Sequence, residues 1–256
     1  MSTLADQLQR VQDRMAAAAR RAGRDPSEVT LVAVSKTHPP EVILQAVELG
    51  VRHFGENRIE EALPKLRAIQ SRFAGVPSPI IWHMIGHVQR RKANEVADLF
   101  DWVHSVDSLR LAERLDRFAG LRGRMLNVLL EFNLSGEASK YGFRADPDSI
   151  RADVLDEVAA MARLPHLQLD GLMTMAPLVA EAEQARPVFR ALRALRDRLE
   201  QRFPQCRWRH LSMGMTDDFE VAIEEGATLV RLGRAIFGER RSANAEPPPP
   251  RSEGRR

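Results

Sequence analysis

Apolar and polar positions alternate along this chain in two repeating patterns from residue 30 onward. Short runs rich in apolar residues, such as TLVAVS at 30–35, have the length and composition of buried strands. Each run is followed by a segment whose apolar residues recur every three or four positions, which is the period of an amphipathic helix. We therefore expect eight strands, over residues 30–35, 51–55, 80–86, 102–106, 125–134, 167–175, 207–213 and 228–233.

A helix is expected after each strand, and one more before the first. Leu4, Leu8, Val11 and Met15 recur at helical spacing near the N-terminus, and Gly23 is placed to end that helix. The other helices are expected over residues 41–50, 57–71, 88–100, 108–119, 148–162, 181–203 and 217–226, with a last helical turn over 234–240.

Eight strand–helix units in about 250 residues are the pattern of a (β/α)8 TIM barrel. Mainly apolar strands between helices indicate a parallel sheet that is covered on both faces. The alternative is a doubly wound open sheet, but no G-x-G-x-x-G follows the first strand. We expect an α/β fold with a single TIM barrel over residues 1–240, which includes the extra N-terminal helix. Residues 241–256, rich in Pro and Arg, are expected to form a disordered tail.

Charge and composition then narrow the classes of partner. The net charge is +3, and the last sixteen residues hold four arginines against two glutamates, so the barrel itself is nearly neutral. No basic run is interleaved with aromatic residues, which argues against nucleic-acid binding. No stretch is apolar for long enough to span a bilayer, and the N-terminus lacks the apolar core of a secretory signal. Cys206 is the sole cysteine, which fits a reducing compartment, so we expect a cytoplasmic protein. We also expect a monomer, because the sequence contains no visible extra interface element.

Barrel proteins carry their chemistry at the C-terminal ends of the strands. The polar residues there contain no paired acids, no His/Asp/Glu cluster at metal-ligand spacing and no Ser-His-Asp order, so no metal site is expected. They are Lys36, Glu56, Asn57, residues 83–86, Ser105, Asn133 with the loop through Lys140 and Tyr141, Thr174, residues 212–214 and residues 231–233.

The loops after the seventh and eighth strands are the positions where barrels commonly bind phosphate. They read HLSMGMTDD and VRLGRAIFG. Gly214 and Gly233 would let backbone N–H groups approach an anion, and Ser212 adds a hydroxyl donor. Either glycine taken singly could serve turn geometry only. Together, at the two expected positions, they favour a phosphate site.

Lys36 directly follows the first strand, at the same mouth. One interpretation is a rim lysine whose stem covers apolar surface while its amine stays in water. In the other, partial desolvation favours the neutral amine, which attacks aldehydes. A lysine, a phosphate pocket and a barrel together indicate pyridoxal phosphate held as a Schiff base.

Two further residues keep alternative interpretations. Asn57 is either the N-cap of the next helix or a hydrogen-bond partner of a cofactor ring. His83 is more typical of a strand histidine satisfied by a local hydrogen bond than of a metal ligand. Asp217 and Asp218 are best explained as the start of a helix, where acids favour the helix dipole.

Several stretches together resemble the pyridoxal phosphate homeostasis proteins. They are LVAVSKTHP, FGENRIEEALPK, WHMIGHVQRRK, HSVDS, NLSGEASKYGF, GLMTMAP and LSMGMTDDFEVAIEEGATLVRLGRAIFG, in order from residue 31 to 238. The resemblance implies a barrel similar to the N-terminal barrel of alanine racemase, with pyridoxal 5'-phosphate as cofactor. It also implies a protein that buffers or delivers this form of vitamin B6, with apo forms of pyridoxal phosphate enzymes as partners, rather than a robust catalyst.

The resemblance also implies roles for individual residues. Lys36 would be the Schiff-base lysine and Asn57 would lie near the ring. Lys140, in the loop ASKYGF, matches a second lysine of the family and would be a relay or secondary attachment site. The residues that would meet the phosphate or the ring nitrogen are Ser212, Met213, Gly214, Arg231, Gly233 and Arg234.

Three arginines depart from the family pattern. Arg234 stands where a small hydroxyl residue is usual, so it removes a hydroxyl donor and adds a cation beside the expected phosphate. Arg58 replaces an aromatic or apolar neighbour of Asn57. The stretch GHVQRRK departs from the commoner family pattern GxLQxNK, and Arg91 stands at its polar position. We expect these changes to alter cofactor affinity rather than cofactor identity.

Two other functions use the same lysine. An amino-acid racemase needs a second acid or base on the opposite face of the cofactor, which two-domain racemases take largely from a following β domain and a partner subunit. This chain has only a sixteen-residue tail after the barrel, which favours the carrier. An aldolase-like enzyme would instead form its Schiff base with a sugar phosphate, and it would be colourless.

Overall fold

The structure, a computed structural model, describes residues 2–73, 80–137, 140–145 and 150–238. The tail expected over 241–256 lies outside the described residues. None of the helices in the described part is long and apolar enough to cross a membrane.

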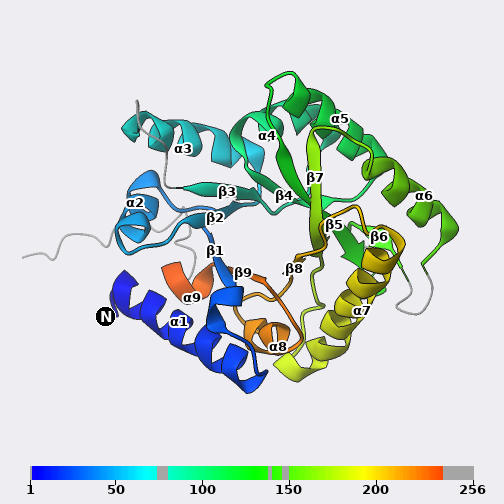
Figure 1. The fold of residues 1–256 in the computed structure, drawn as a ribbon. Helices are drawn as coiled ribbons and strands as arrows, with labels where there is room; N and C mark the ends of the chain where they lie inside the picture. Colours follow the sequence, from blue (N-terminus) through cyan, green and yellow to red (C-terminus); the bar gives the residue numbers. More distant parts are fainter. Residues whose placement is uncertain (1, 74–79, 138–139, 146–149, 239–256) are drawn as a thin grey trace, which may run out of the picture.

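Eight parallel strands close into a barrel, which confirms the expected fold class (Figure 1). Around the ring each strand pairs with the next, β4 pairs with β5, and β9 pairs with β1 to close it. The barrel strands are β1 (Thr30–Val34), β2 (His53–Glu56), β3 (Ile81–Met84), β4 (Trp102–Val106), β5 (Leu126–Asn133), β7 (Leu167–Met173), β8 (His210–Ser212) and β9 (Leu229–Leu232).

One barrel contact requires glycine. Gly171 in β7 has φ +148°, and a Cβ at this position would lie 1.9 Å from the backbone oxygen of His210 in β8. β7 and β8 can therefore pair in this register only because no side chain separates them.

Helices surround the barrel, and α1 lies across α8 and α9 at its closing edge (Figure 1). Thr3 caps α1 in a reciprocal capping box with Asp6, and Gly23 with φ +69° follows its end, as expected. The helices are α1 (Leu4–Arg21), α2 (Pro40–Glu48), α3 (Ile59–Arg72), α4 (Ala93–Leu99), α5 (Leu109–Gly120), α6 (Ala152–Met161), α7 (Arg186–Arg202), α8 (Phe219–Glu224) and α9 (Arg234–Phe237).

The bounds of most expected elements shift by a few residues; the strand expected over 207–213, for example, is only His210–Ser212. Three short segments differ in type. The start of the helix expected over 181–203 is a 3-10 turn, Ala182–Ala185, and the start of the one expected over 88–100 contains another, Arg90–Lys92. A short strand, β6 (Phe143–Arg144), pairs in parallel with Phe132 and Asn133 where only a loop was expected. A two-residue strand is defined by its partner rather than by its own pattern.

The apolar core has two parts. The larger one fills the space between strands and helices. A small cluster inside the barrel, Val32, Leu129, Met173 and Leu229, fills the interior. Because strand side chains alternate, residues two positions further along these strands also face inward, toward the C-terminal mouth. In β9 that residue is Arg231, and in β5 it is Glu131, so polar groups line the upper interior.

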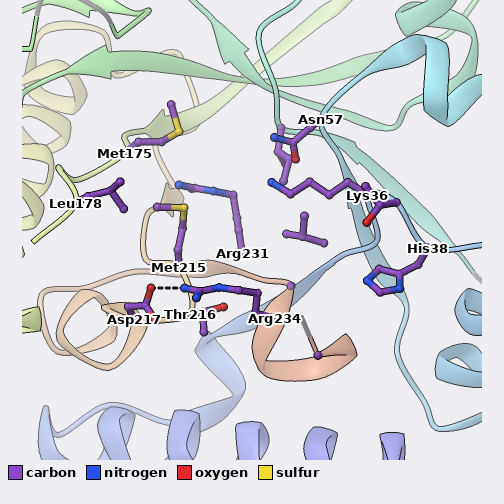
Figure 2. Close-up of a pocket in the computed structure, with 15 residues that line it drawn as sticks. Lys36, His38, Asn57, Met175, Leu178, Met215, Thr216, Asp217, Arg231 and Arg234 are labelled. Carbon is purple, nitrogen blue, oxygen red and sulfur yellow. Dashed lines mark hydrogen bonds and ion pairs between the residues drawn. The ribbon is translucent and has the colours of Figure 1, made fainter. Parts of the chain in front are cut away.

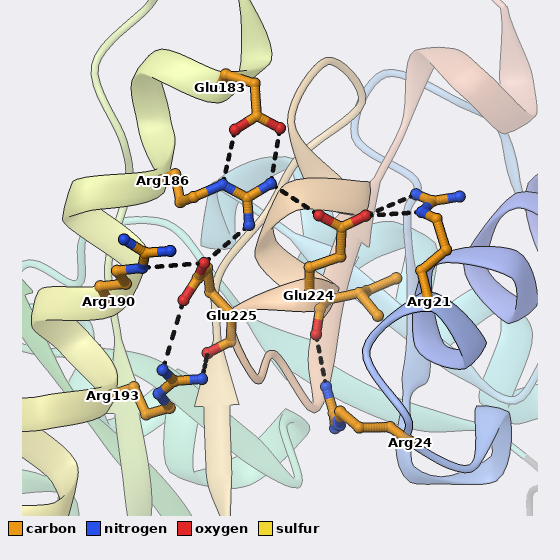
Figure 3. Close-up of polar contacts among 9 residues, drawn as sticks. Arg21, Arg24, Glu183, Arg186, Arg190, Arg193, Glu224 and Glu225 are labelled. Atoms are coloured by element: carbon orange, nitrogen blue, oxygen red, sulfur yellow. Dashed lines mark hydrogen bonds and ion pairs between the residues drawn. The ribbon is translucent and has the colours of Figure 1, made fainter.

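Ion pairs fasten α1, α7 and α8 to one another (Figure 3). Arg186 in α7 contacts Glu224 and Glu225 at 2.8 Å each, and Arg21 in α1 reaches Glu224 at 2.8 Å. Arg24 donates to the backbone oxygen of Ile223 at 2.8 Å. This network ties the N-terminal helix to α7 and to the C-terminal end of α8, which directly precedes the closing strand β9.

Candidate functional site

A cavity of about 450 Å³ opens at the mouth of the barrel, where the C-terminal ends of the strands meet (Figure 2). The structure brings five of the predicted site residues to it. These are Lys36, Asn57, Arg231, Gly233 and Arg234. Ser212 and Met213 are fully buried and do not line the cavity themselves, and Gly214 follows them along the chain. The other lining residues are Val34, Thr37, His38, Ile85, Met175, Leu178, Met215, Thr216, Asp217 and Gly238.

The turn after β1 aims Lys36 into the cavity. Ser35 is buried and donates from Oγ to Glu56 Oε1 at 2.7 Å, while its backbone oxygen accepts from Lys65 Nζ at 2.8 Å. Thr37 adopts φ +67°, and its N–H bonds to the Glu61 carboxylate. Figure 2 shows the Lys36 side chain extending across the cavity between Asn57 and Arg231.

A buried ion pair supports this turn. Lys65 Nζ lies 2.8 Å from Glu56 Oε1, and the two side chains are 7% and 0% exposed. Burial raises the pKa of Glu56, and the charge and hydrogen bond of Lys65 oppose that rise. The pair holds the ends of β1 and β2 together directly behind the lysine.

Asn57 lines the cavity and does not cap the helix that follows it. The N-cap position of α3 is Arg58, which removes the simpler of the two interpretations of Asn57. Asn57 Oδ1 is buried and has no hydrogen-bond partner among the described residues. A buried unpaired amide oxygen costs free energy unless something fills the site.

Arg231 is a buried cation at the base of the cavity. It donates from one guanidinium nitrogen to Ser212 Oγ at 2.6 Å and from another to the backbone oxygen of Thr174 at 3.0 Å. Burial lowers the pKa of Arg231 to about 10, while Asp218 and Glu131 oppose the shift. The guanidinium therefore stays charged near neutral pH and can only donate hydrogen bonds.

Of the two predicted glycine turns, Gly233 lines the cavity, and Gly214 directly precedes the lining residue Met215. Gly214 has φ +93°, and a Cβ there would lie 2.6 Å from Ala222 Cβ, so the turn admits only glycine. Gly233 is the N-cap residue of α9. Arg234 follows it and forms an exposed ion pair with Asp217 across the cavity, which the sequence did not indicate (Figure 2).

The two predicted secondary residues lie apart from the cavity. Lys140 pairs with Glu137 at 2.7 Å and contacts the backbone oxygen of Met175 at 3.4 Å, so it stands beside a lining residue. His83 is fully buried inside the barrel and is hydrogen-bonded on both ring nitrogens, as expected of a strand histidine. Among the described residues, no three His, Cys, Asp or Glu side chains are grouped to hold a metal ion.

Sequence reasoning missed two buried titratable groups near Arg231. Burial and the charge of Asp107 raise the pKa of Glu131 to about 7, while Arg231 opposes the rise. His104 is fully buried and bonds Ser212. Glu131 did carry a signal, because it is the single charge within the apolar strand NVLLEFN.

Known proteins resemble the chain over almost its whole length. Residues 7–241 match the family of the alanine racemase N-terminal domain. Pyridoxal phosphate homeostasis proteins of Escherichia coli and Pseudomonas aeruginosa are 42% and 45% identical to it over 241 and 242 residues. Each alignment covers 94% of this chain, and 98% and 97% of the respective relatives. The chain belongs to the family of pyridoxal phosphate homeostasis proteins.

Solved structures also resemble this chain. PipY of Synechococcus elongatus, solved with pyridoxal phosphate bound, is 39% identical, with a TM-score of 0.74 over 89% of this chain and 100% of that one. An alanine racemase from Clostridium difficile has a TM-score of 0.66 at 15% identity, over 93% of this chain and 58% of its own. The likeness to the racemase is one of fold.

Proposed function

We propose that this homeostasis protein binds pyridoxal 5'-phosphate at the mouth of its barrel and buffers or delivers it, without sustained catalysis. The names of its relatives and the pyridoxal phosphate bound to PipY support this role. One observation carries the proposal for this chain. Lys36, Asn57 and the buried guanidinium of Arg231 line a single cavity together with Gly233, and Asn57 Oδ1 is buried without a hydrogen-bond partner among the described residues.

Lys36 would hold the cofactor covalently and reversibly. When bound, pyridoxal phosphate supplies an aldehyde that reacts with amines. Lys36 Nζ would attack its carbonyl carbon, and the carbonyl oxygen would leave as water to form the Schiff base. The same reaction runs backward with water or with a competing amine, which suits storage and release.

The phosphate end would meet the two glycine turns. Gly214 and Gly233 let the backbone approach an anion, and Ser212 and Arg234 add a hydroxyl and a cation. The Arg234–Asp217 pair is exposed, at 55% and 69%, so opening it to bind an anion costs little. Arg231 can only donate, so it would pair with a lone pair of the phosphate or of the ring nitrogen.

Three finer statements belong to the same proposal. The protein would act in the cytoplasm and as a monomer, and apo forms of pyridoxal phosphate enzymes would receive the cofactor. Lys140, beside Met175, would serve as a relay or secondary attachment site. Delivery can be tested by mixing the loaded protein with an apoenzyme and following the recovery of its activity.

The absorbance spectrum tests the central claim. Purified protein reconstituted with pyridoxal phosphate should be yellow, because the Schiff base absorbs visible light. Both Lys36→Ala and Lys36→Arg should lose this absorbance, since alanine has no amine and arginine keeps the charge but forms no Schiff base. Lys140→Ala is the matched control and should stay yellow. Borohydride reduction and peptide mapping should place the pyridoxyl tag on Lys36. Absence of the tag from Lys36 would overturn the assignment, and sustained conversion of L- to D-alanine would contradict the non-catalytic role.

A further inference from the structure

A chain of hydrogen bonds crosses the barrel interior from the cavity to the opposite end. His53 Nδ1 lies 2.9 Å from His83 Nε2, and His83 Nδ1 lies 2.9 Å from His104 Nε2. His104 Nδ1 lies 2.9 Å from Ser212 Oγ, to which Arg231 donates at 2.6 Å. The members come from β2, β3, β4, β8 and β9. We call His53, His83, His104 and Ser212 the histidine chain.

The two ends of the histidine chain lie at opposite ends of the barrel. Ser212 is the last residue of β8, and Arg231 lines the cavity at the mouth. His53 is the first residue of β2, at the N-terminal end of the strands, and is half-buried. A parallel barrel brings the strand starts to one face and the strand ends to the other, so the chain joins the cavity to the far face.

The direction of the bonds follows from the donors available. Burial holds the pKa of His83 and His104 well below the usual value, so each ring is neutral and has one N–H and one lone pair. Arg231 can only donate, so Ser212 Oγ accepts from it. Ser212 Oγ has a second lone pair, but if it accepted from His104 as well, its own hydroxyl hydrogen would have no acceptor among the described residues. The hydroxyl hydrogen therefore points to His104 Nδ1, 2.9 Å away.

The remaining tautomers are then determined one after another. His104 must carry its hydrogen on Nε2 and donate to His83 Nδ1. His83 must likewise carry its hydrogen on Nε2 and donate to His53 Nδ1. Without ligand, every bond therefore points outward, from Arg231 to His53.

We propose that the histidine chain is a two-state positioning element, in which an acceptor against Ser212 and a proton on His53 favour the same, reversed orientation. A phosphate oxygen that accepts from Ser212 takes the hydroxyl hydrogen away from His104. His104 then donates from Nδ1 to Ser212, and His83 and His53 reverse in turn. A proton on His53 imposes this same orientation, because it puts a hydrogen on Nδ1 facing His83.

The reversal links anion binding in the cavity to protonation at the far face of the barrel. The inference rests on the proposed function in one respect, the placement of a phosphate against Ser212. Besides His83, two charged or titratable groups face His53. Burial lowers the pKa of His53, the charge of His210 lowers it further, and the charge of Asp101 raises it. At the other end of the histidine chain, the charges of Asp218 and Glu131 raise the pKa of Arg231, against the effect of burial. Linkage is reciprocal. Ligand binding must therefore change the proton affinity of His53 by the same factor by which protonation of His53 changes the affinity for the ligand.

Nitrogen-15 NMR of labelled histidines tests the proposal directly. The ligand-free protein should show His83 and His104 as Nε2–H tautomers, and saturation with pyridoxal 5'-phosphate should convert both to Nδ1–H. The acid dissociation constant of His53 should fall at least about fivefold on binding. His210 is the internal control for direct charge effects. It lies at the same end of the barrel, bonds Thr228 and is outside the chain, so its change should be smaller.

His104→Asn separates the chain from long-range charge. The asparagine keeps a polar group near Ser212 but cannot reach His83, so the response of His53 should drop to that of His210. Nδ1–H tautomers in the ligand-free wild-type protein would overturn the proposal even if the variant fails to fold. An equal response of His53 and His210 would overturn it as well. Failure to bind pyridoxal phosphate would refute the proposed function, and the ligand-free tautomers would still decide the direction of the chain.

Discussion

Lys65 Nζ lies 2.8 Å from Glu56 Oε1 in the barrel wall behind Lys36, and neither side chain is appreciably exposed. Removing one partner of a buried pair leaves the other charge without compensation. Lys65→Met should therefore lower the free energy of unfolding at pH 7 by about 3–5 kcal/mol, measured by urea denaturation.

The control replaces both charges of that pair. The double variant Glu56→Gln, Lys65→Met leaves no buried charge and should recover most of the loss. Equal losses in the single and double variants would show that the pair contributes through packing alone.

The ion pair between Arg234 and Asp217 should compete with anion binding at the mouth. Asp217→Asn frees the Arg234 guanidinium, so we expect pyridoxal phosphate to bind more tightly by about 1.5- to 5-fold, the range for an exposed pair. The gain should shrink at high salt. Arg234→Gln should weaken binding, and adding Asp217→Asn to it should bring no gain. A gain that persists without Arg234 would assign the effect to Asp217 itself.

Glu131 should make cofactor affinity depend on pH near neutrality. Its pKa is raised to about 7, so the side chain is neutral below that pH and negative above it. A new negative charge close to Arg231 repels an anionic ligand, so affinity should fall as pH rises through about 7. Glu131→Gln should remove this dependence on pH, and the ratio of wild-type to variant dissociation constants should rise about 3.5-fold between pH 6 and 8, for an interaction of ~1 kcal/mol. A constant ratio would mean that Glu131 does not sense the ligand.

The buried histidines should make the fold sensitive to acid. The pKa values of His83 and His104 are lowered in the folded state, so below about pH 6.5 the unfolded chain binds more protons and stability falls as pH falls. Between pH 6.5 and 5.5 each histidine contributes an average slope of about 1 kcal/mol per pH unit, because the unfolded imidazole is only partly protonated at the upper end of this range. His104→Asn should reduce the slope of unfolding free energy between pH 6.5 and 5.5 by about that amount. Parallel curves for the two proteins would contradict it.

Much of the fold could be predicted because its signals are local. Strand and helix periods lie within segments of five to twenty residues, and Gly23 ends α1 by its own backbone freedom. The two-residue strand β6 has no such period. It exists because Phe143 and Arg144 lie beside the end of β5, which no local pattern reports.

The candidate site could be predicted in part for a geometric reason. A parallel barrel gathers the C-terminal ends of its strands, so Lys36, Asn57 and Arg231 could be assigned to one mouth before any contact was known. The pairing of Arg234 with Asp217 could not, because it depends on where two loops direct their side chains. The same holds for Glu131, whose pKa depends on burial and on Asp107.

Periodicity, turn residues and the residue types at strand ends can be read from the sequence alone. They were enough to predict the barrel, its mouth and the cofactor class. Hydrogen-bond partners and burial belong to the folded molecule. His104 and Ser212 are 108 positions apart along the chain and 2.9 Å apart in space. The protonation of such a group depends on the low-dielectric interior around it, and that interior exists only once all eight strands have closed.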